Sequence, residues 1–229
     1  MTYQTYLVGG AVRDQIMGLK PKDMDYAVEA PSFSAMREDL LARGFVIFQE
    51  REEFGVIRAR KNKETSDYVL CRKEGPYTDQ RHPDWVTIGT IEDDLARRDF
   101  TINALARNVE TGEVLDLWGG VDDIEGSILR AVGDPSDRLT EDPLRGFRAI
   151  RFAVTKGFHI DPELAFAMRL VRVLDGLEAT SVERMREELG KAFAFDSAKT
   201  MRLLVFSFPE YLDIAQERGL WYTPTTAKR

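Results

Sequence analysis

Two aspartates one residue apart, Asp23 and Asp25 in KDMDYAV, are the sharpest chemical feature of the sequence. Met24 to Val28 is expected to form a strand, and alternate residues of a strand point to the same face, so the two carboxylates would lie side by side. A divalent ion such as Mg²⁺ takes carboxylate ligands and keeps positions open for phosphate oxygens. The pair therefore predicts a metal site. The plain alternative is a loop cap followed by an exposed strand residue.

A glycine pair precedes the aspartates. Gly9 and Gly10 lie between an expected strand, Tyr6 to Val8, and an expected helix. Glycines let backbone N–H groups approach an anion where a helix begins. Arg13, one turn into the helix, could pair with the same phosphate in bidentate geometry. Together with the carboxylates this arrangement predicts a nucleoside triphosphate site, and the alternative is a tight turn with a solvated Arg13–Asp14 pair.

A third carboxylate and two arginines could reach the same site. Asp67 begins an expected strand, and it reaches the metal if that strand lies beside the one that carries Asp25; otherwise it faces solvent. The segment EDDLARRDFTINALA is expected to be one helix over Asp93–Arg107. Its Arg97 and Arg98 could bind the triphosphate or the sugar, or else form a solvated ladder with the aspartates one turn earlier.

A second group of polar residues lies in EDPLRGFRAIRFA. At about 100° per residue, Asp142, Arg145, Arg148 and Arg151 share one half of a helix, and the apolar residues share the other. A carboxylate acceptor beside a guanidinium donor could read the hydrogen-bonding edge of a base, where cytosine and adenine present amino groups. The alternative is an ordinary solubilising face.

The secondary-structure elements that position these residues follow two different sequence patterns in the two parts of the chain. The first 130 residues or so mix short strands with helices, whereas the rest shows only helical periods and turn signals. This change predicts two domains, 1–135 and 136–229. Further expected elements are a helix capped by Ser32, strands Val46–Phe48, Phe54–Ala59 and Val114–Leu117, a loop over Arg72–Asp84, a helix from Asp161 to Leu174, and a helix opened by a capping box of Thr180 and Glu183.

Composition narrows the classes of protein. The 229 residues carry a net charge of -7, with the acidic excess in residues 1–140, which does not favour non-specific nucleic-acid binding by charge alone. The single cysteine excludes an intrachain disulfide, and two histidines leave a metal to be held by carboxylates. With no apolar run long enough for a membrane and no signal peptide, the chain is expected to be cytoplasmic.

These segments together resemble a family. The sequence is similar to class II tRNA nucleotidyltransferases (CCA-adding enzymes) and bacterial poly(A) polymerases, which belong to the polymerase-beta-like nucleotidyltransferase superfamily. YLVGGAVRD with KDMD resembles motif A, EDDLARRDFTINALA motif B, VLDLWGG motif C, EDPLRGFRAIRF motif D and SVERMREEL motif E. The motifs occur in the family's order over most of the chain.

The resemblance implies an α+β head, with a small mixed sheet and flanking helices, followed by an all-helical neck. It implies catalytic roles for Asp23, Asp25 and Asp67, with Mg²⁺ bound by the first two. The residues implied to bind the nucleotide are Gly9, Gly10, Arg13, Arg98, Asp142, Arg145, Arg148 and Arg151. Of these, Asp142 and Arg145 would select CTP or ATP by reading the base.

The implied activity is addition of C and A residues to the 3′ end of tRNA or a tRNA-like RNA. Alternatives are partial (CC- or A-) addition, poly(A) synthesis, and nucleotide or RNA binding without turnover. Family members continue into helical body and tail domains, which this chain is expected to lack. A second copy or a partner subunit could then supply RNA-binding surface. Residues that could form an apolar docking patch, or close the helical domain's own core, are Phe206, Phe208, Tyr211, Leu220 and Trp221.

Overall fold

The computed structural model describes residues 3–79 and 82–220. The chain divides into two compact units. The sheet unit comprises Met1–Tyr77, Pro83–Gly126 and Arg130–Gly133, and the helical unit comprises Thr78–His82, Ser127–Leu129 and Asp134–Arg229. The assignment of residues 1–135 and 136–229 as two domains stays a prediction.

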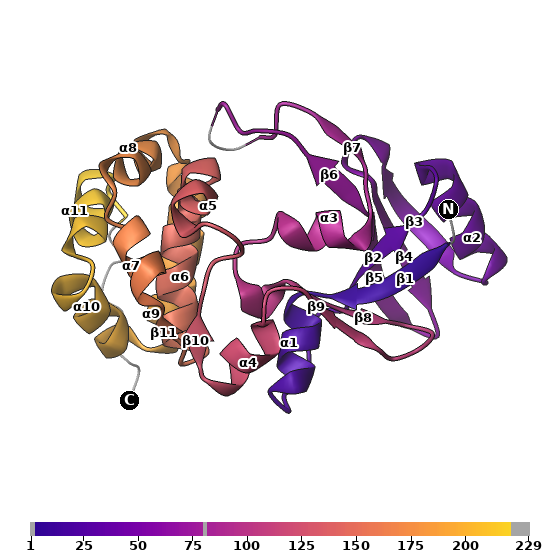
Figure 1. The fold of residues 1–229 in the computed structure, drawn as a ribbon, viewed down its shortest axis with the longest axis horizontal. Coiled ribbons are helices and arrows are strands. Elements are labelled where there is room, and N and C mark those ends of the chain that lie inside the picture. Colours follow the sequence, from indigo (N-terminus) through magenta and orange to yellow (C-terminus); the bar gives the residue numbers. More distant parts are fainter. Residues whose placement is uncertain (1–2, 80–81, 221–229) are drawn as a thin grey trace. The chain divides into compact units, whose positions relative to one another are not determined.

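A mixed sheet forms the centre of the sheet unit (Figure 1). Its strands are β1 (Gln4–Val8), β2 (Asp25–Glu29), β3 (Val46–Arg51), β4 (Val56–Lys61), β5 (Glu64–Leu70), β8 (Leu105–Asn108) and β9 (Val114–Asp116). They lie in the order β3-β4-β5-β2-β1-β8-β9, with β2 and β5 parallel and all other neighbours antiparallel. The helices of this unit are α1 (Gly10–Ile16), α2 (Phe33–Ala42), α3 (Ile91–Ala96) and α4 (Gly120–Glu125).

Apolar alternation along the strands makes two cores, one on each face of the sheet. On the α2 face, Ile57 and Tyr68 pack with Met36 of α2. On the opposite side, which we call the α3 face, Ala27 packs with Ile91 and Leu95 of α3. Because successive side chains of a strand point to opposite faces, Asp25 and Asp67 lie on the α3 face. The Ser32 cap of α2 is confirmed, since its Oγ accepts from the backbone N–H of Ala35 at 3.0 Å.

The prediction of a single helix over Asp93–Arg107 is wrong. The chain there forms α3, a 3₁₀ turn η2 (Thr101–Asn103) and β8. The helix ends because the Asp99 carboxylate accepts from the backbone N–H of Phe100 at 2.8 Å and from Nδ2 of Asn103 at 3.0 Å. Beyond this break the chain forms β8, which pairs with β1, so strand pairing replaces the helical period.

A short segment from beyond residue 126 completes the sheet unit. The backbone N–H of Thr101 donates to the carbonyl of Arg130 at 3.0 Å, and that of Val132 donates to the carbonyl of Asp99 at 3.2 Å. Phe100, fully buried, forms an isolated bridge with Ala131. Residues 130–133 are therefore part of the core around motif B, although 127–129 belong to the helical unit.

Two other local expectations for the sheet unit need correction. The loop expected over Arg72–Asp84 begins with β6 (Arg72–Glu74), which pairs with β7 (Val86–Ile88). The strand expected from Phe54 begins later, because Glu52–Phe54 forms the 3₁₀ turn η1 and Gly55 follows it with a φ of 64°. That left-handed backbone is one that glycine adopts without steric cost.

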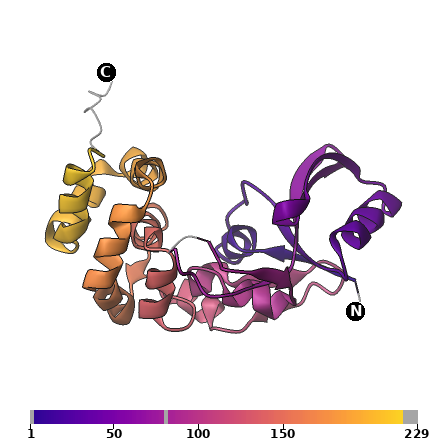
Figure 2. The same ribbon diagram turned by 90° about the horizontal axis from the view of Figure 1, so that it is seen from above.

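Where it is described, the helical unit consists of helices apart from one short parallel strand pair, β10 (Ile128–Leu129) with β11 (His159–Ile160); its ribbon runs from rose through orange to yellow in Figures 1 and 2. Its helices are α5 (Pro135–Glu141), α6 (Leu144–Thr155), α7 (Pro162–Ala167), α8 (Val171–Ala179), α9 (Val182–Phe195), α10 (Ser197–Phe206) and α11 (Pro209–Glu217). The core lies along α6, where Phe147 and Ile150 are fully buried, as the amphipathic pattern predicted.

Two helix boundaries of this unit also differ from expectation. The helix expected from Asp161 to Leu174 is two helices, because Leu170 has an extended backbone between α7 and α8. The capping box of Thr180 and Glu183 is wrong. Thr180 ends α8, and Ser181 caps α9 by accepting from the backbone N–H of Arg184 at 3.3 Å. Adjacent Ser and Thr side chains offer the same capping chemistry, and the sequence pattern did not separate them.

Most of the expected apolar docking patch is core. Phe208, Tyr211 and Leu220 are buried, whereas Phe206 is 80% exposed. Trp221 lies outside the described residues. These three buried residues thus close the helical unit's own interior. Across the described residues, no helix has both the length and the apolarity that a bilayer span requires.

Candidate nucleotidyltransfer site

The carboxylates expected to act together lie on adjacent strands. Asp25 begins β2 and is the register partner of Asp67 on the parallel strand β5, so the condition under which Asp67 could reach the site is met. Asp23 lies in the bend before β2. Although Asp25 is exposed, the protein around its carboxylate desolvates it and raises its pKa, and the negative charges of Asp67 and Asp23 add to this effect.

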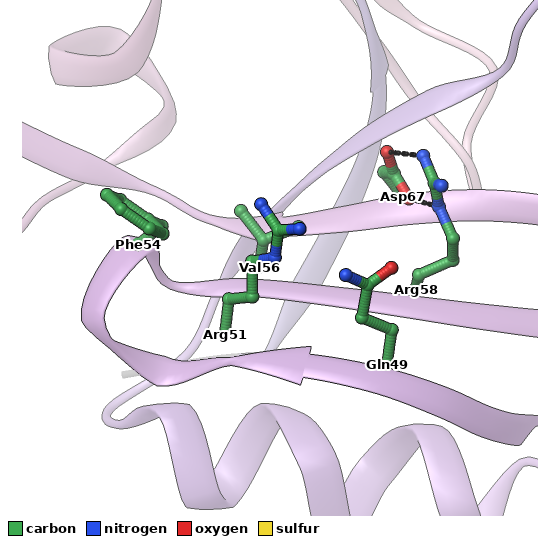
Figure 3. A pocket seen from close by; sticks show the side chains of 6 residues that line it. All are labelled: Gln49, Arg51, Phe54, Val56, Arg58 and Asp67. Atoms are coloured by element: carbon green, nitrogen blue, oxygen red, sulfur yellow. Dashed lines mark hydrogen bonds and ion pairs between the residues drawn. The ribbon is translucent and has the colours of Figure 1, made fainter.

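One arginine that the sequence did not single out binds Asp67. Arg58 of β4 is the cross-strand partner of Asp67, and its Nε and Nη2 donate to Oδ1 at 2.5 Å and to Oδ2 at 2.7 Å (Figure 3). These hydrogen bonds raise the pKa of Arg58. Both oxygens of Asp67 are therefore engaged by a bidentate guanidinium. The pairing depends on the β4–β5 register, which the sequence pattern alone does not specify.

A cavity of about 200 Å³ adjoins Asp25. The described residues that line it are Val8, Gly9, Gly10, Asp25, Tyr26, Ala27, Val69, Asp94, Arg97 and Arg98. Gly9 has a φ of 65°, and a Cβ built there would lie 2.6 Å from Nη1 of Arg98. Glycine is thus needed at this position both for its backbone and for the space that the arginine occupies.

Asp94, which the sequence analysis did not select, holds both motif B arginines. It is 1% exposed, and its Oδ1 accepts from Nη2 of Arg97 at 2.5 Å while its Oδ2 accepts from Nη2 of Arg98 at 2.9 Å. Burial alone would raise the pKa of Asp94, but the charges and hydrogen bonds of Arg98 and Arg97 outweigh it and lower the pKa. The solvated ladder is therefore wrong for this pair. The spacing of three and four residues was the available signal.

Arg98 keeps one donor for a ligand. Its side chain is 21% exposed, and its Nε is buried without a hydrogen-bond partner among the described residues. A buried N–H without an acceptor is costly, and a phosphate oxygen in the cavity would satisfy it. Arg97 also lines the cavity, and its Nη1 lies 3.4 Å from Oε1 of Glu74 in β6.

Arg13 has a different environment from the one expected. It is buried, its Nη1 donates to Oδ1 of Asn103 at 2.5 Å, and its Nε and Nη2 donate to Asp14 at 2.9 and 2.7 Å. It is not among the described residues that line the cavity. Nη2 of Arg13 would lie 3.4 Å from a Cβ at Gly10, so the Arg13 side chain packs against the glycine turn.

The residues fit a divalent cation that shares its shell with phosphate. Among the described residues, no cluster of three or more His, Cys, Asp or Glu side chains could enclose a metal ion by itself. Mg²⁺ is typically bound by one or two carboxylates plus substrate phosphates and water. The pKa of Asp25 is raised first by desolvation of its carboxylate and then by the negative charges of Asp67 and Asp23, and a bound cation would offset both effects.

The arginines of α6 are bound to acidic residues within the helical unit. Arg148 and Arg151 both pair with Glu188 of α9, the first at 3.7 Å from Nη1 to Oε1. The guanidinium of Arg151 also lies over the Phe152 ring, 4.1 Å from its centroid. Glu188 is 7% exposed, so this cluster ties α6 to α9. The solubilising interpretation of this face is too simple for these two residues.

Asp142 and Arg145 lie close in sequence but have separate partners. Asp142 precedes α6, where its Oδ1 accepts from the backbone N–H of Leu144 and its Oδ2 accepts from Nη2 of Arg184 at 2.9 Å. Arg145 is 8% exposed, and its Nη1 donates to the Arg138 carbonyl at 2.8 Å and to Glu141 at 2.9 Å. Arg184, in the segment resembling motif E, is a partner that the sequence analysis did not name.

An α+β unit with carboxylates on adjacent strands, beside a glycine turn and two ordered arginines, has the architecture of a nucleotidyltransferase head. A family model described as the poly A polymerase head domain matches residues 5–130, which is more than half of the chain. The chain therefore belongs to the poly(A) polymerase head-domain family. The expected resemblance and the expected α+β fold class are both confirmed.

Curated relatives extend the similarity into the helical unit. The chain is 39% identical over 190 residues to the CCA-adding enzyme of Leuconostoc mesenteroides and 40% identical over 195 residues to that of Levilactobacillus brevis. These alignments cover 82% and 83% of this chain but only 45% and 47% of the relatives. The chain thus spans about half the length of the curated relatives it matches.

Solved structures show the same coverage. The CCA-adding enzyme of Bacillus stearothermophilus in complex with CTP is similar with a TM-score of 0.75 at 33% identity, over 90% of this chain and 48% of that one. A CCA-adding enzyme in apo form II is similar with a TM-score of 0.79 at 27% identity, over 92% of this chain and 50% of the other.

Proposed function

We propose that this chain is a Mg²⁺-dependent nucleotidyltransferase that adds C and A residues from CTP and ATP to the 3′ end of tRNA or a tRNA-like RNA. The observation that carries the proposal is the pairing of Asp25 with Asp67 beside the cavity lined by Gly9 and Arg98. Relatives named CCA-adding enzymes, one of them solved with CTP, support the choice of substrates. The proposed compartment is the cytoplasm, where CTP, ATP and RNA occur together.

In this proposal Asp23 and Asp25 hold Mg²⁺, and Asp67 supports them. Held by these carboxylates, the ion would lower the pKa of the RNA 3′ hydroxyl and stabilise the charge of the departing pyrophosphate. Arg98 donates from Nε to a phosphate oxygen, and Asp94 keeps that guanidinium oriented. No covalent intermediate on the protein is required.

The remaining cavity residues have supporting parts in the proposal. Gly9 and Gly10 would present their backbone to the triphosphate; a Cβ at Gly9 would clash with Arg98, whereas one at Gly10 would make an ordinary contact with Arg13. Arg13, expected to contact phosphate, would act by holding the turn, because its guanidinium is bound to Asp14 and Asn103.

The helical unit is proposed to supply base selection. Asp142 and Arg145 would present an acceptor and a donor to the base, and Arg148 and Arg151 would contact the nucleotide. Asp142 is paired with Arg184, so it would bind the base either beside that arginine or in exchange for it. Arg148 and Arg151 would likewise share or give up their ion pairs with Glu188 when they contact the nucleotide. Base selection is therefore coupled to the α6–α9 ion pairs.

The test is extension of RNA at single-nucleotide resolution. The chain is incubated with Mg²⁺ and tRNA transcripts that end before CCA, after C and after CC, with CTP and ATP separately and together. Three additions that end in A are expected. CC only, A only, or a long adenylate ladder would replace CCA addition with a partial or poly(A) activity. CTP or ATP binding without extension by the parent chain would contradict the enzyme and leave a binding module.

The oligomeric state requires a separate measurement. If a second copy supplies RNA-binding surface, light scattering at high protein concentration should give the mass of a dimer or larger assembly. A monomer at every concentration would contradict self-association and leave a partner subunit as the remaining source.

A further inference from the structure

A second pocket lies on the α3 face of the sheet, over β3, β4 and β5 (Figure 3). Its volume is about 220 Å³. The described residues that line it are Gln49, Arg51, Phe54, Val56, Arg58 and Asp67. It contains no residue of the glycine turn and neither motif B arginine, so it is distinct from the cavity assigned to the triphosphate.

This pocket adjoins the candidate active site, because Asp67 lines the pocket and is paired with Asp25. Register pairs join Gln49 to Arg58, Arg58 to Asp67, and Asp67 to Asp25. Residues paired in this way point to the same face, so the four side chains form one row across four strands. The pocket therefore lies on one side of the Asp25–Asp67 pair, and the cavity with Gly9 and Arg98 lies on the other.

The chemistry of the pocket suits a single-stranded nucleic acid. Phe54 is 55% exposed and lines the pocket from the η1 turn, where its ring could stack on a base. Arg51 is exposed at the end of β3. With the Gln49 amide oriented to satisfy both groups, its oxygen accepts from Nη2 and Nε of Arg51 at 3.0 Å each, which orders the guanidinium over the sheet.

The acidic residues of the same segment point elsewhere or lie outside the pocket. Glu50, on the α2 face of β3, accepts from Nε of Arg37 at 3.0 Å. Glu52 and Glu53 are in η1 and are not among the described residues that line the pocket. Asp67 is neutralised by Arg58, so Arg51 leaves the pocket with a net positive charge.

A transfer reaction needs two substrates on opposite sides of the reacting atoms. We propose that this pocket binds the last nucleotides of the acceptor RNA strand, with a base stacked on Phe54 and a phosphate on Arg51, so that the 3′ hydroxyl reaches Asp25. The inference rests on the proposed function, since it names the site of the second substrate. Aromatic stacking with a cationic groove is the usual means of holding single strands.

The experiment measures RNA and nucleotide binding separately on the whole chain. A fluorescent five-nucleotide RNA ending in C is titrated by anisotropy, and CTP binding is measured by calorimetry on the same proteins. Phe54→Ala is expected to weaken RNA binding about tenfold, and Phe54→Trp to retain it. Arg51→Ala is expected to weaken RNA binding and to lower the salt dependence, log Kd against log salt, by about 0.7. CTP affinity should be unchanged in all three.

Matched controls lie nearby. Phe48 is also 55% exposed on β3 but is not among the described residues lining the pocket, and Arg37 is an exposed arginine on α2. Phe48→Ala and Arg37→Ala should bind the RNA like the parent. The inference is overturned if the parent binds no RNA, or if Phe54→Ala and Arg51→Ala bind as the parent does. RNA binding that depends on both residues, without transfer by the parent, would instead contradict the proposed function alone.

Discussion

Asp25 and Asp67 occupy paired positions on the two parallel strands of an otherwise antiparallel sheet. This pairing brings together two carboxylates from segments about forty residues apart. The same row continues through Arg58, which binds Asp67 with two hydrogen bonds and leaves Asp25 with the less compensated charge. The pair therefore has one structurally held member and one available to a cation.

Asp25→Asn should slow transfer strongly while leaving the fold intact or more stable. The pKa of Asp25 is raised in the folded chain, so its charged form at neutral pH opposes folding, and a neutral amide removes that cost. We expect kcat/KM to fall on the order of 10³-fold and the denaturation midpoint in EDTA to rise or stay the same. Retained transfer would contradict the metal role, and a lower midpoint would contradict the charge argument.

Gly9→Ala should damage both stability and nucleotide binding. Gly9 has a φ of 65° and a ψ of -128°, a backbone region essentially restricted to glycine, so an alanine there costs about 1–3 kcal/mol, and its Cβ would displace Arg98. Gly18→Ala is the matched control, because Gly18 has a φ of 70° but no described atom within 4 Å of a built Cβ. Denaturation should show a loss for both variants that is larger for Gly9→Ala, because only its Cβ meets a side chain, and calorimetry should show weaker CTP binding for Gly9→Ala alone. Equal CTP affinity in the two variants would place Arg98 outside the nucleotide site.

Asp94→Ala should destabilise the sheet unit strongly. It would leave two largely buried guanidinium groups without their shared acceptor, at a cost of about 3–5 kcal/mol. Asp93→Ala, which removes only a capping box, should cost about 1 kcal/mol. Urea denaturation of both variants measures the difference, and similar losses would contradict the shared role of Asp94.

The lowered pKa of Asp94 makes the stability of the chain depend on pH. The folded pKa of Asp94 is lowered, so its stabilising contribution is present above its unfolded pKa, close to 3.8, and is lost as pH falls through the lower folded pKa. Denaturation free energies should therefore fall more steeply below about pH 4 in the parent than in Asp94→Asn. Parallel pH curves would contradict this assignment.

Gly146→Ala tests the core of the helical unit. A Cβ at this position would clash with Oη of Tyr211, a fully buried hydroxyl with no hydrogen-bond partner among the described residues. The overpacking should cost about 1–3 kcal/mol. Tyr211→Phe should be nearly neutral and should restore part of the loss when combined with Gly146→Ala. A double-mutant cycle with no coupling would show that the helices shift instead.

The sequence predicted the features that depend on local chemistry. The Ser32 cap, the apolar side of α6 and the strands that carry Asp25 and Asp67 follow from residue types and short periods, whereas the adjacency of those two strands was only a condition. The phosphate contact expected for Arg13 also rested on local residue types. Its guanidinium instead binds the buried Asn103, which is remote in sequence and gave no local signal.

The rest depended on long-range pairing. The helical period of motif B continues past Arg98, yet the chain leaves the helix because Asp99 captures backbone and side-chain donors and the following residues join β1. The contacts of Asp67 with Arg58 and of Asp142 with Arg184 likewise need a register or a helix contact before they exist. Such contacts cannot be predicted from spacing within one segment.

The return of residues 130–133 to the sheet unit has a consequence for folding during synthesis. Phe100 cannot complete its pairing with Ala131 until the chain has been translated through the intervening Ser127–Leu129, which belongs to the other unit. A ribosome-bound chain that stops near Gly126 should therefore hold an unfinished motif B, however complete its strands are. Nascent-chain proteolysis should show protection of the sheet unit only after Gly133 has left the exit tunnel.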